Sequence, residues 1–170
     1  SRDELGRLIA VVHQNVFLFH GTIAENISLG RTDIDRATIE AAARYVYAEE
    51  FIRQLDGGFD FVVAHSGANL SVGQGQLIAF ARAVAARAEL IVLDEATSSV
   101  DSVTESMIER ALASLYADKT VIAIAHRLST IRGADKILVL DAGTVVEAGN
   151  HESLLAMHGC YAKLLGETNA

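Results

Sequence analysis

The stretch Leu90-Ile91-Val92-Leu93-Asp94-Glu95 decides the fold. Four consecutive apolar residues predict a buried strand, and this strand ends directly in two carboxylates. In an open α/β sheet, ligands bind at the carboxyl ends of the strands, so Asp94 is placed to hold Mg²⁺ against a phosphate. Glu95, its neighbour, is placed to act as a base on a water molecule. Taken alone, the pair is equally compatible with two carboxylates that only open a loop.

Short apolar strands alternate with helical patterns around this stretch. Strands are expected at 9–12, 120–125 and 137–140, and the last of these turns at Asp141-Ala142-Gly143 into a hairpin with 144–147. Helices are expected at 34–45 with Thr32 or Asp33 as the cap, at 48–55, at 74–87, from the Ser102–Glu105 capping box onward, and as a final pair capped by Asn150. The block from about 22 to 70 shows no strand pattern. The whole predicts an α/β fold with a parallel sheet and a helical insertion.

Composition excludes several classes of protein. Apolar residues make up 51% of the 170 residues, which excludes a disordered chain. The one cysteine, Cys160, excludes a disulfide scaffold and favours a reducing, cytosolic setting. No apolar run reaches the roughly 18 residues that a membrane-spanning helix requires. The 14 basic and 22 acidic residues give a net charge of −8, so we expect no nucleic-acid partner bound by bulk charge.

A second motif, Asn69-Leu70-Ser71-Val72-Gly73-Gln74, stands just before a predicted helix. Backbone N–H groups and the positive end of the helix dipole favour an anion at such a terminus, and the Ser71 hydroxyl adds a donor. Taken alone, an ordinary serine cap beside a glycine-rich turn explains this motif better.

Two further polar residues follow predicted strands. Gln14 follows 9–12, and His126 follows 120–125. Alone, a single glutamine carries little information, and a histidine in this position is more often a hydrogen-bonded structural residue. If the strands are parallel, however, Gln14, Asp94, Glu95 and His126 all lie at one edge of the sheet, around a possible Mg²⁺-phosphate site.

With these motifs in order, the chain resembles the nucleotide-binding domain of an ABC transporter of the exporter type. Gln14 matches the Q-loop glutamine, Leu70–Gln74 the signature motif and Leu90–Glu95 the Walker B strand. Ser98–Asp101 matches the D-loop, and His126 matches the switch histidine. The resemblance implies a P-loop NTPase-like parallel sheet, truncated at the N-terminus, with a helical signature-motif subdomain at about 22–88. Residues 1–21 and 89–170 would form the rest of the catalytic core.

The resemblance also implies roles for residues. Asp94 and Gln14 would support Mg²⁺, Glu95 would polarise the attacking water, and His126 would contact the γ-phosphate of ATP. Across a dimer, Asp101 would couple the two sites. The residues expected to reach the nucleotide of a second ATP-binding domain are Ser71, Gly73 and Gln74. Phe17, Phe19 and residues 63–67 would lie near a transmembrane permease, which places the domain at the cytoplasmic face of the cell membrane.

The chain departs from the family pattern in ways that carry expectations. It contains no Gly-x-x-x-x-Gly-Lys-Ser/Thr loop, so we expect it to be the C-terminal part of one ATP-binding domain, inactive alone. We also expect strands 9–12 and 90–93 to lack the neighbour that carries that loop. Val72 replaces a signature glycine, and we expect this position to have an ordinary negative φ with its side chain turned away. His65 replaces an acidic residue that is common in this region of the family.

Two alternatives to an ATP-driven exporter remain open at this point. One is a soluble ABC ATPase that acts on DNA or ribosomes. The other is a regulatory remnant that supplies only its signature face to an intact partner.

Overall fold

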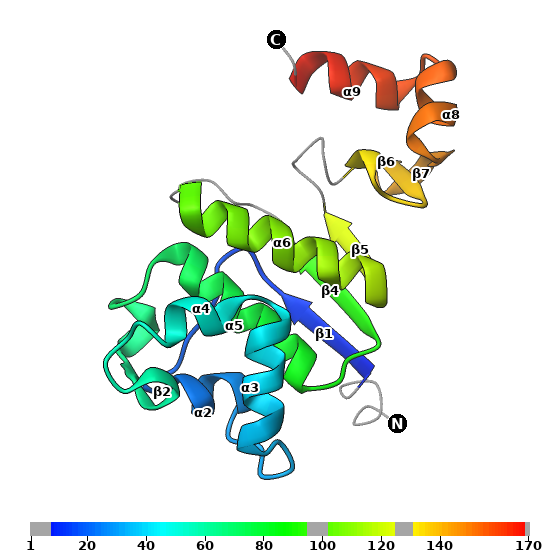
Figure 1. The fold of residues 1–170 in the computed structure, drawn as a ribbon. Coiled ribbons are helices and arrows are strands. Elements are labelled where there is room, and N and C mark those ends of the chain that lie inside the picture. The colour runs from blue at the N-terminus through cyan, green and yellow to red at the C-terminus, as the bar shows by residue number, and fades with distance from the viewer. Residues whose placement is uncertain (1–7, 95–101, 125–130, 169–170) are drawn as a thin grey trace. The chain divides into compact units, whose positions relative to one another are not determined.

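The computed structural model describes residues 8–94, 102–124 and 131–168 (Figure 1). The chain divides into two compact units, residues 1–124 and 125–170, and each is described by itself. Glu95, Asp101 and His126 lie outside the described residues.

A three-stranded parallel sheet forms the centre of the first unit. Its strands are β1 (Ile9–Val12), β4 (Leu90–Asp94) and β5 (Thr120–Ile124), in the order β1-β4-β5. The predicted strands and their parallel direction are thereby confirmed. The expectation that residues 90–93 lack a neighbour is wrong, because β4 pairs with β1 on one side and with β5 on the other.

Two long helices cover one face of this sheet. Helix α5 (Val72–Ala85) and helix α6 (Ser102–Asp118) pack on each other, and they bury alternate strand residues such as Ile91 and Leu93. Helix α5 also packs on β1. Side chains on the alternate positions, including Val11 and Ile122, are exposed. The core of the unit therefore lies between one face of the sheet and the helices.

The segment between β1 and α5 is helical, as predicted, but its helices begin and end at other residues than expected. Helix α2 (Ile23–Ser28) was not expected, and its first turn is closed by a capping box of Thr22 and Glu25. Helix α3 (Arg36–Tyr45) begins after Asp35, whose side chain accepts a hydrogen bond from the Thr38 N–H, so the expected cap at Thr32 or Asp33 is wrong. Helix α4 (Ala48–Ile52) ends earlier than expected.

The expectation of no strand between 22 and 70 is also wrong. Strands β2 (Gly21–Thr22) and β3 (Val62–Val63) form a two-residue antiparallel pair. Two short 3₁₀ helices, η1 (Gly58–Asp60) and η2 (His65–Gly67), flank β3. A pair this short leaves no alternating pattern in the sequence, which is why the periodicity did not indicate it.

The second unit contains the predicted hairpin and the final helical pair. Strands β6 (Ile137–Asp141) and β7 (Thr144–Gly149) are joined by Ala142 and Gly143, both with positive φ. Helix α8 (His151–Ala156) is capped by Asn150, as predicted, and helix α9 (Cys160–Thr168) follows. The Glu147 carboxylate accepts hydrogen bonds from the first two N–H groups of α9, at 2.5 and 3.0 Å, and so ties the helix to the hairpin.

Candidate functional site

The carboxyl ends of β1, β4 and β5 meet at one edge of the sheet. Val12 lies opposite Leu93 and Asp94 lies opposite Ile124, so the strands end level with one another. Gln14, which is exposed, follows the end of β1, and the half-buried Asp94 ends β4. The register thus brings these two oxygen-bearing side chains to the same edge, as the parallel arrangement required.

The strand register does not give the positions of three further residues that were expected at the site. Glu95 follows Asp94 in the sequence, His126 comes two positions after the end of β5, and Asp101 precedes α6. All three lie outside the described residues, so their roles stay predictions. Among the residues that the structure describes, no group of three histidine, cysteine, aspartate or glutamate side chains is placed to hold a metal ion.

The second motif forms the beginning of α5. Ser71 is the N-cap: its Oγ accepts a hydrogen bond from the Gln74 N–H at 3.2 Å, and the Gln74 Oε1 accepts one from the Ser71 N–H at 2.9 Å. The serine-cap interpretation is therefore confirmed, and the helix begins at Val72 rather than at 74. A capped N-terminus of a 14-residue helix still presents N–H groups and a positive dipole to an anion.

Val72 and Gly73 both have helical backbone, and neither has a positive φ. The expected ordinary φ at Val72 is thus confirmed, and its side chain is 64% exposed. Gly73 is buried. Within the described part of the chain, no hydrogen bond or ion pair joins Ser71 or Gln74 to Gln14 or Asp94.

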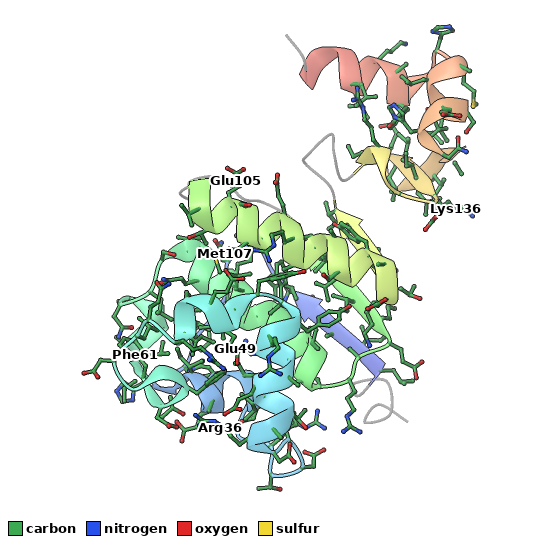
Figure 2. All side chains as sticks on the ribbon, viewed as in Figure 1. Arg36, Glu49, Phe61, Glu105, Met107 and Lys136 are labelled. Carbon is green, nitrogen blue, oxygen red and sulfur yellow. The ribbon has the colours of Figure 1, made fainter. Side chains whose placement is uncertain are left out.

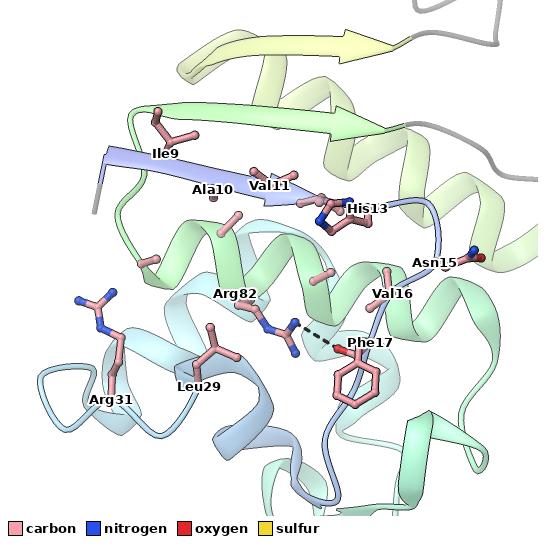
Figure 3. A pocket seen from close by; sticks show the side chains of 14 residues that line it. Ile9, Ala10, Val11, His13, Asn15, Val16, Phe17, Leu29, Arg31 and Arg82 are labelled. Atoms are coloured by element: carbon pink, nitrogen blue, oxygen red, sulfur yellow. Dashed lines mark hydrogen bonds between the residues drawn. The ribbon is translucent and has the colours of Figure 1, made fainter. Parts of the chain in front are cut away.

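A pocket of about 420 Å³ lies beside β1 and α5, and Arg82 is among the side chains that line it (Figure 3). The Arg82 Nε donates to the Asn26 carbonyl at 2.9 Å, and its Nη1 donates to the Phe17 carbonyl at 3.3 Å. Burial lowers the pKa of this guanidinium from its ordinary value. Sequence reasoning missed the arrangement, although Thr22-x-x-Glu25 is a readable capping-box pattern that predicts the helix carrying Asn26.

Two aromatic rings stand beside this pocket on the surface. Phe17 and Phe19 meet edge to face, with their ring centroids 5.0 Å apart, and they are 54% and 50% exposed. Paired exposed aromatic rings are typical of surfaces that contact another protein. In the described residues, no helix is both long enough and apolar enough to cross a membrane.

Comparisons with known proteins agree with this arrangement. A family model described as ABC transporter matches residues 1–98, and the chain belongs to that family. It is 50% identical over 160 residues to an ATP-dependent lipid A-core flippase of Chromohalobacter salexigens, which covers 94% of this chain and 28% of the flippase. It is 48% identical over 164 residues to a fatty acid ABC transporter ATP-binding/permease protein of Mycobacterium bovis, covering 96% of this chain and 26% of that protein.

A solved structure of a bacterial Atm1-family ABC exporter with ATP bound resembles the fold closely. The TM-score is 0.88 at 38% identity, over 100% of this chain and 30% of the exporter chain. The chain therefore spans less than a third of the length of these relatives.

Proposed function

We propose that this chain is part of the ATP-binding and ATP-hydrolysing domain of an ABC exporter. The parallel register that brings Gln14 and Asp94 to one sheet edge carries the proposal. This edge is the place where an open α/β sheet binds its ligand. The similarity to a flippase, a fatty acid transporter and an Atm1-family exporter supports export as the process that ATP drives.

The side chains at the sheet edge fit magnesium chemistry. Mg²⁺ prefers oxygen ligands, and the Asp94 carboxylate and the Gln14 amide oxygen are such ligands. When bound, the ion would neutralise negative charge on the ATP phosphates. Glu95, next to Asp94 in the sequence, would orient the attacking water and take its proton, and His126 would donate a hydrogen bond to the γ-phosphate.

The first turn of α5 would complete the site of a partner domain. The residues that would contact that nucleotide are Ser71, Gly73 and Gln74. In the described residues, no hydrogen bond joins this turn to Gln14 or Asp94, as expected if the nucleotide is held between two domains. A two-fold pair places each signature turn against the nucleotide of the other domain. Asp101 would couple the two sites.

The aromatic surface of Phe17 and Phe19 would contact the transmembrane permease. We include residues 63–67 in this contact, a segment in which Val63 and Gly67 are buried. The permease would hold the domain at the cytoplasmic face of the membrane, either fused in one chain or as a separate subunit. The transported molecule is selected by the permease and not by these residues.

Steady-state ATP hydrolysis tests the proposal. The intact protein that carries this chain, in lipid nanodiscs, should hydrolyse ATP only when Mg²⁺ is present. The 170-residue chain alone should not hydrolyse ATP, because it lacks the lysine and the glycine-rich loop that bind the phosphates. An intact protein that binds no ATP and shows no Mg²⁺-dependent turnover would overturn the proposal.

A further inference from the structure

Arg82 joins the helix of the signature motif to the aromatic surface. The side chain leaves α5, the helix that begins at Ser71, and reaches two carbonyl groups of the preceding segment. One belongs to Asn26 in α2, at 2.9 Å. The other belongs to Phe17, at 3.3 Å (Figure 3). The guanidinium also lies 5.8 Å from the centroid of the Phe19 ring. The planar guanidinium of Arg82 therefore donates hydrogen bonds to two carbonyl groups and also lies near one aromatic ring.

Asn26 holds the same segment from its other side. Its Oδ1 accepts a hydrogen bond from the Phe19 N–H at 2.9 Å, and its Nδ2 donates to the Phe19 carbonyl at 3.0 Å. Nδ2 also donates to the Thr22 carbonyl at 3.1 Å, and the residue is only 1% exposed. A fully bonded, buried amide is a rigid support. The backbone of Phe17 to Phe19 is thus fixed to α2 and, through Arg82, to α5.

The position of Arg82 has a cost that an apolar residue would avoid. Its Nη2 is buried without a hydrogen-bond partner in the described part of the chain. A buried, unpaired donor of a charged group costs free energy, whereas a methionine of similar length would fill the space without that penalty. An arginine at this position donates hydrogen bonds to two carbonyl groups, and a methionine cannot form them.

We propose that Arg82 is a positioning residue that transmits movement of the first turn of α5 to the Phe17–Phe19 surface. The inference rests on the proposed function, since it requires a nucleotide to contact the signature turn. An α-helix of 14 residues moves as a rigid body, so a displacement at Ser71 also displaces Arg82. Because the Arg82 guanidinium is bonded to the Phe17 carbonyl, Phe17 moves with the helix. The surface that faces the permease therefore changes position when ATP binds between the two domains.

Hydrogen–deuterium exchange on the intact protein tests this coupling without knowledge of the transported molecule. The probe is the non-hydrolysable analogue AMP-PNP with Mg²⁺, and the exchange of residues 71–77 and 15–20 is compared with and without it. In the unsubstituted protein, we expect the analogue to slow exchange in both segments. In Arg82→Met, residues 71–77 should still respond. Residues 15–20 should exchange about tenfold faster and should no longer respond.

Arg36→Met is the matched control. Arg36 also bonds two partners, Glu40 and Asp60, and its guanidinium lies 5.0 Å from the centroid of the Phe59 ring (Figure 2). In the described residues, no hydrogen bond or ion pair joins its side chain to α5, Phe17 or Phe19. This variant should keep the response in both segments. If Arg82→Met fails to fold, Arg82→Lys carries the test, since lysine keeps the charge and lacks the planar fork. Its response at 15–20 should also be lost.

The results of this experiment distinguish a failure of the positioning role of Arg82 from a failure of the proposed function. A response at 15–20 that survives in Arg82→Met or in Arg82→Lys overturns the positioning role. So does a response confined to 71–77 in the unsubstituted protein, while the proposed function then still stands. No response in either segment means that nucleotide does not reach the signature turn, and the proposed function fails.

Discussion

Val12 of β1 lies directly opposite Leu93 of β4 in a parallel register, and this pairing brings Gln14 and Asp94 to the same edge of the sheet. The two residues come from segments far apart in the sequence, on either side of the helices α2 to α5. The candidate site thus depends on the register of two strands, and a shift by one residue would turn Asp94 to the other face.

The first prediction concerns Asp94. Asp94→Asn in the intact protein removes a charged oxygen ligand, so the Mg²⁺ concentration for half-maximal ATP hydrolysis should rise by about tenfold or more. A Mg²⁺ titration of the steady-state rate measures this. Glu89→Gln is the control, because Glu89 precedes the opposite end of β4 and is exposed. An unchanged titration in Asp94→Asn, or an equal shift in both variants, contradicts the assignment.

The second prediction concerns the signature turn. Val72 is exposed and has ordinary helical backbone, so Val72→Gly should leave turnover within about twofold and lower stability slightly, since glycine gains entropy in the unfolded chain. Gly73→Ala should reduce turnover by about 100-fold, because its added methyl group would displace a phosphate that must approach the backbone closely, and a displacement of about 1 Å costs about that much. The steady-state rate of ATP hydrolysis at saturating ATP is measured for both variants. A large increase in turnover in Val72→Gly would mean that the native signature turn is impaired, which favours the regulatory remnant. Unchanged turnover in Gly73→Ala would show that this turn takes no part in the mechanism.

The third prediction concerns a hydrogen bond that links α3 to α6. The Tyr45 hydroxyl lies 2.8 Å from both the Ser114 carbonyl and the Asp118 carboxylate, and burial and the Asp118 carboxylate raise its pKa to about 12. The folded state favours the protonated phenol, so its stabilisation is complete below the ordinary pKa of 10.0 and is lost as the pH rises toward about 12. Tyr45→Phe should lower stability by about 1 kcal/mol near neutral pH.

Thermal unfolding of the intact protein at about pH 8 and about pH 12 measures this difference. The gap between Tyr45→Phe and the unsubstituted protein should narrow at the higher pH. Tyr47→Phe is the control, since its ring packs under the Arg110 guanidinium at 3.9 Å and no hydrogen bond of its hydroxyl is described. A gap that stays constant with pH would show that the Tyr45 hydroxyl does not stabilise the fold through its protonated form.

Much of the fold was predictable because its signals are local. The β-branched run at 9–12 and the apolar run at 90–93 indicated the two strands, and Ala142-Gly143 indicated the hairpin turn. Asp94 was predictable as a site residue because a carboxylate that follows a buried strand is visible in the sequence itself. The serine cap at Ser71 was equally visible.

The remaining features depend on tertiary contacts that no local pattern encodes. Helix α2 has only six residues, and its stability comes from the buried Ile23 and Ile27. The contact of Arg82 with Asn26 and Phe17 joins residues 56 and 65 positions apart, so periodicity gave no sign of it. The roles of Glu95, Asp101 and His126 stay predictions, because these residues lie outside the described part of the chain.

The Glu95→Gln variant of the intact protein tests most directly whether residues at this edge of the sheet catalyse ATP hydrolysis. Glutamine keeps the shape of the side chain but neither accepts a proton nor carries the negative charge. Steady-state turnover and ATP affinity are measured on the same preparation. We predict a loss of turnover of about 100-fold or more with ATP affinity unchanged within about twofold. Undiminished turnover in Glu95→Gln would show that Glu95 is not the base, and the proposed role of this sheet edge in hydrolysis would fail.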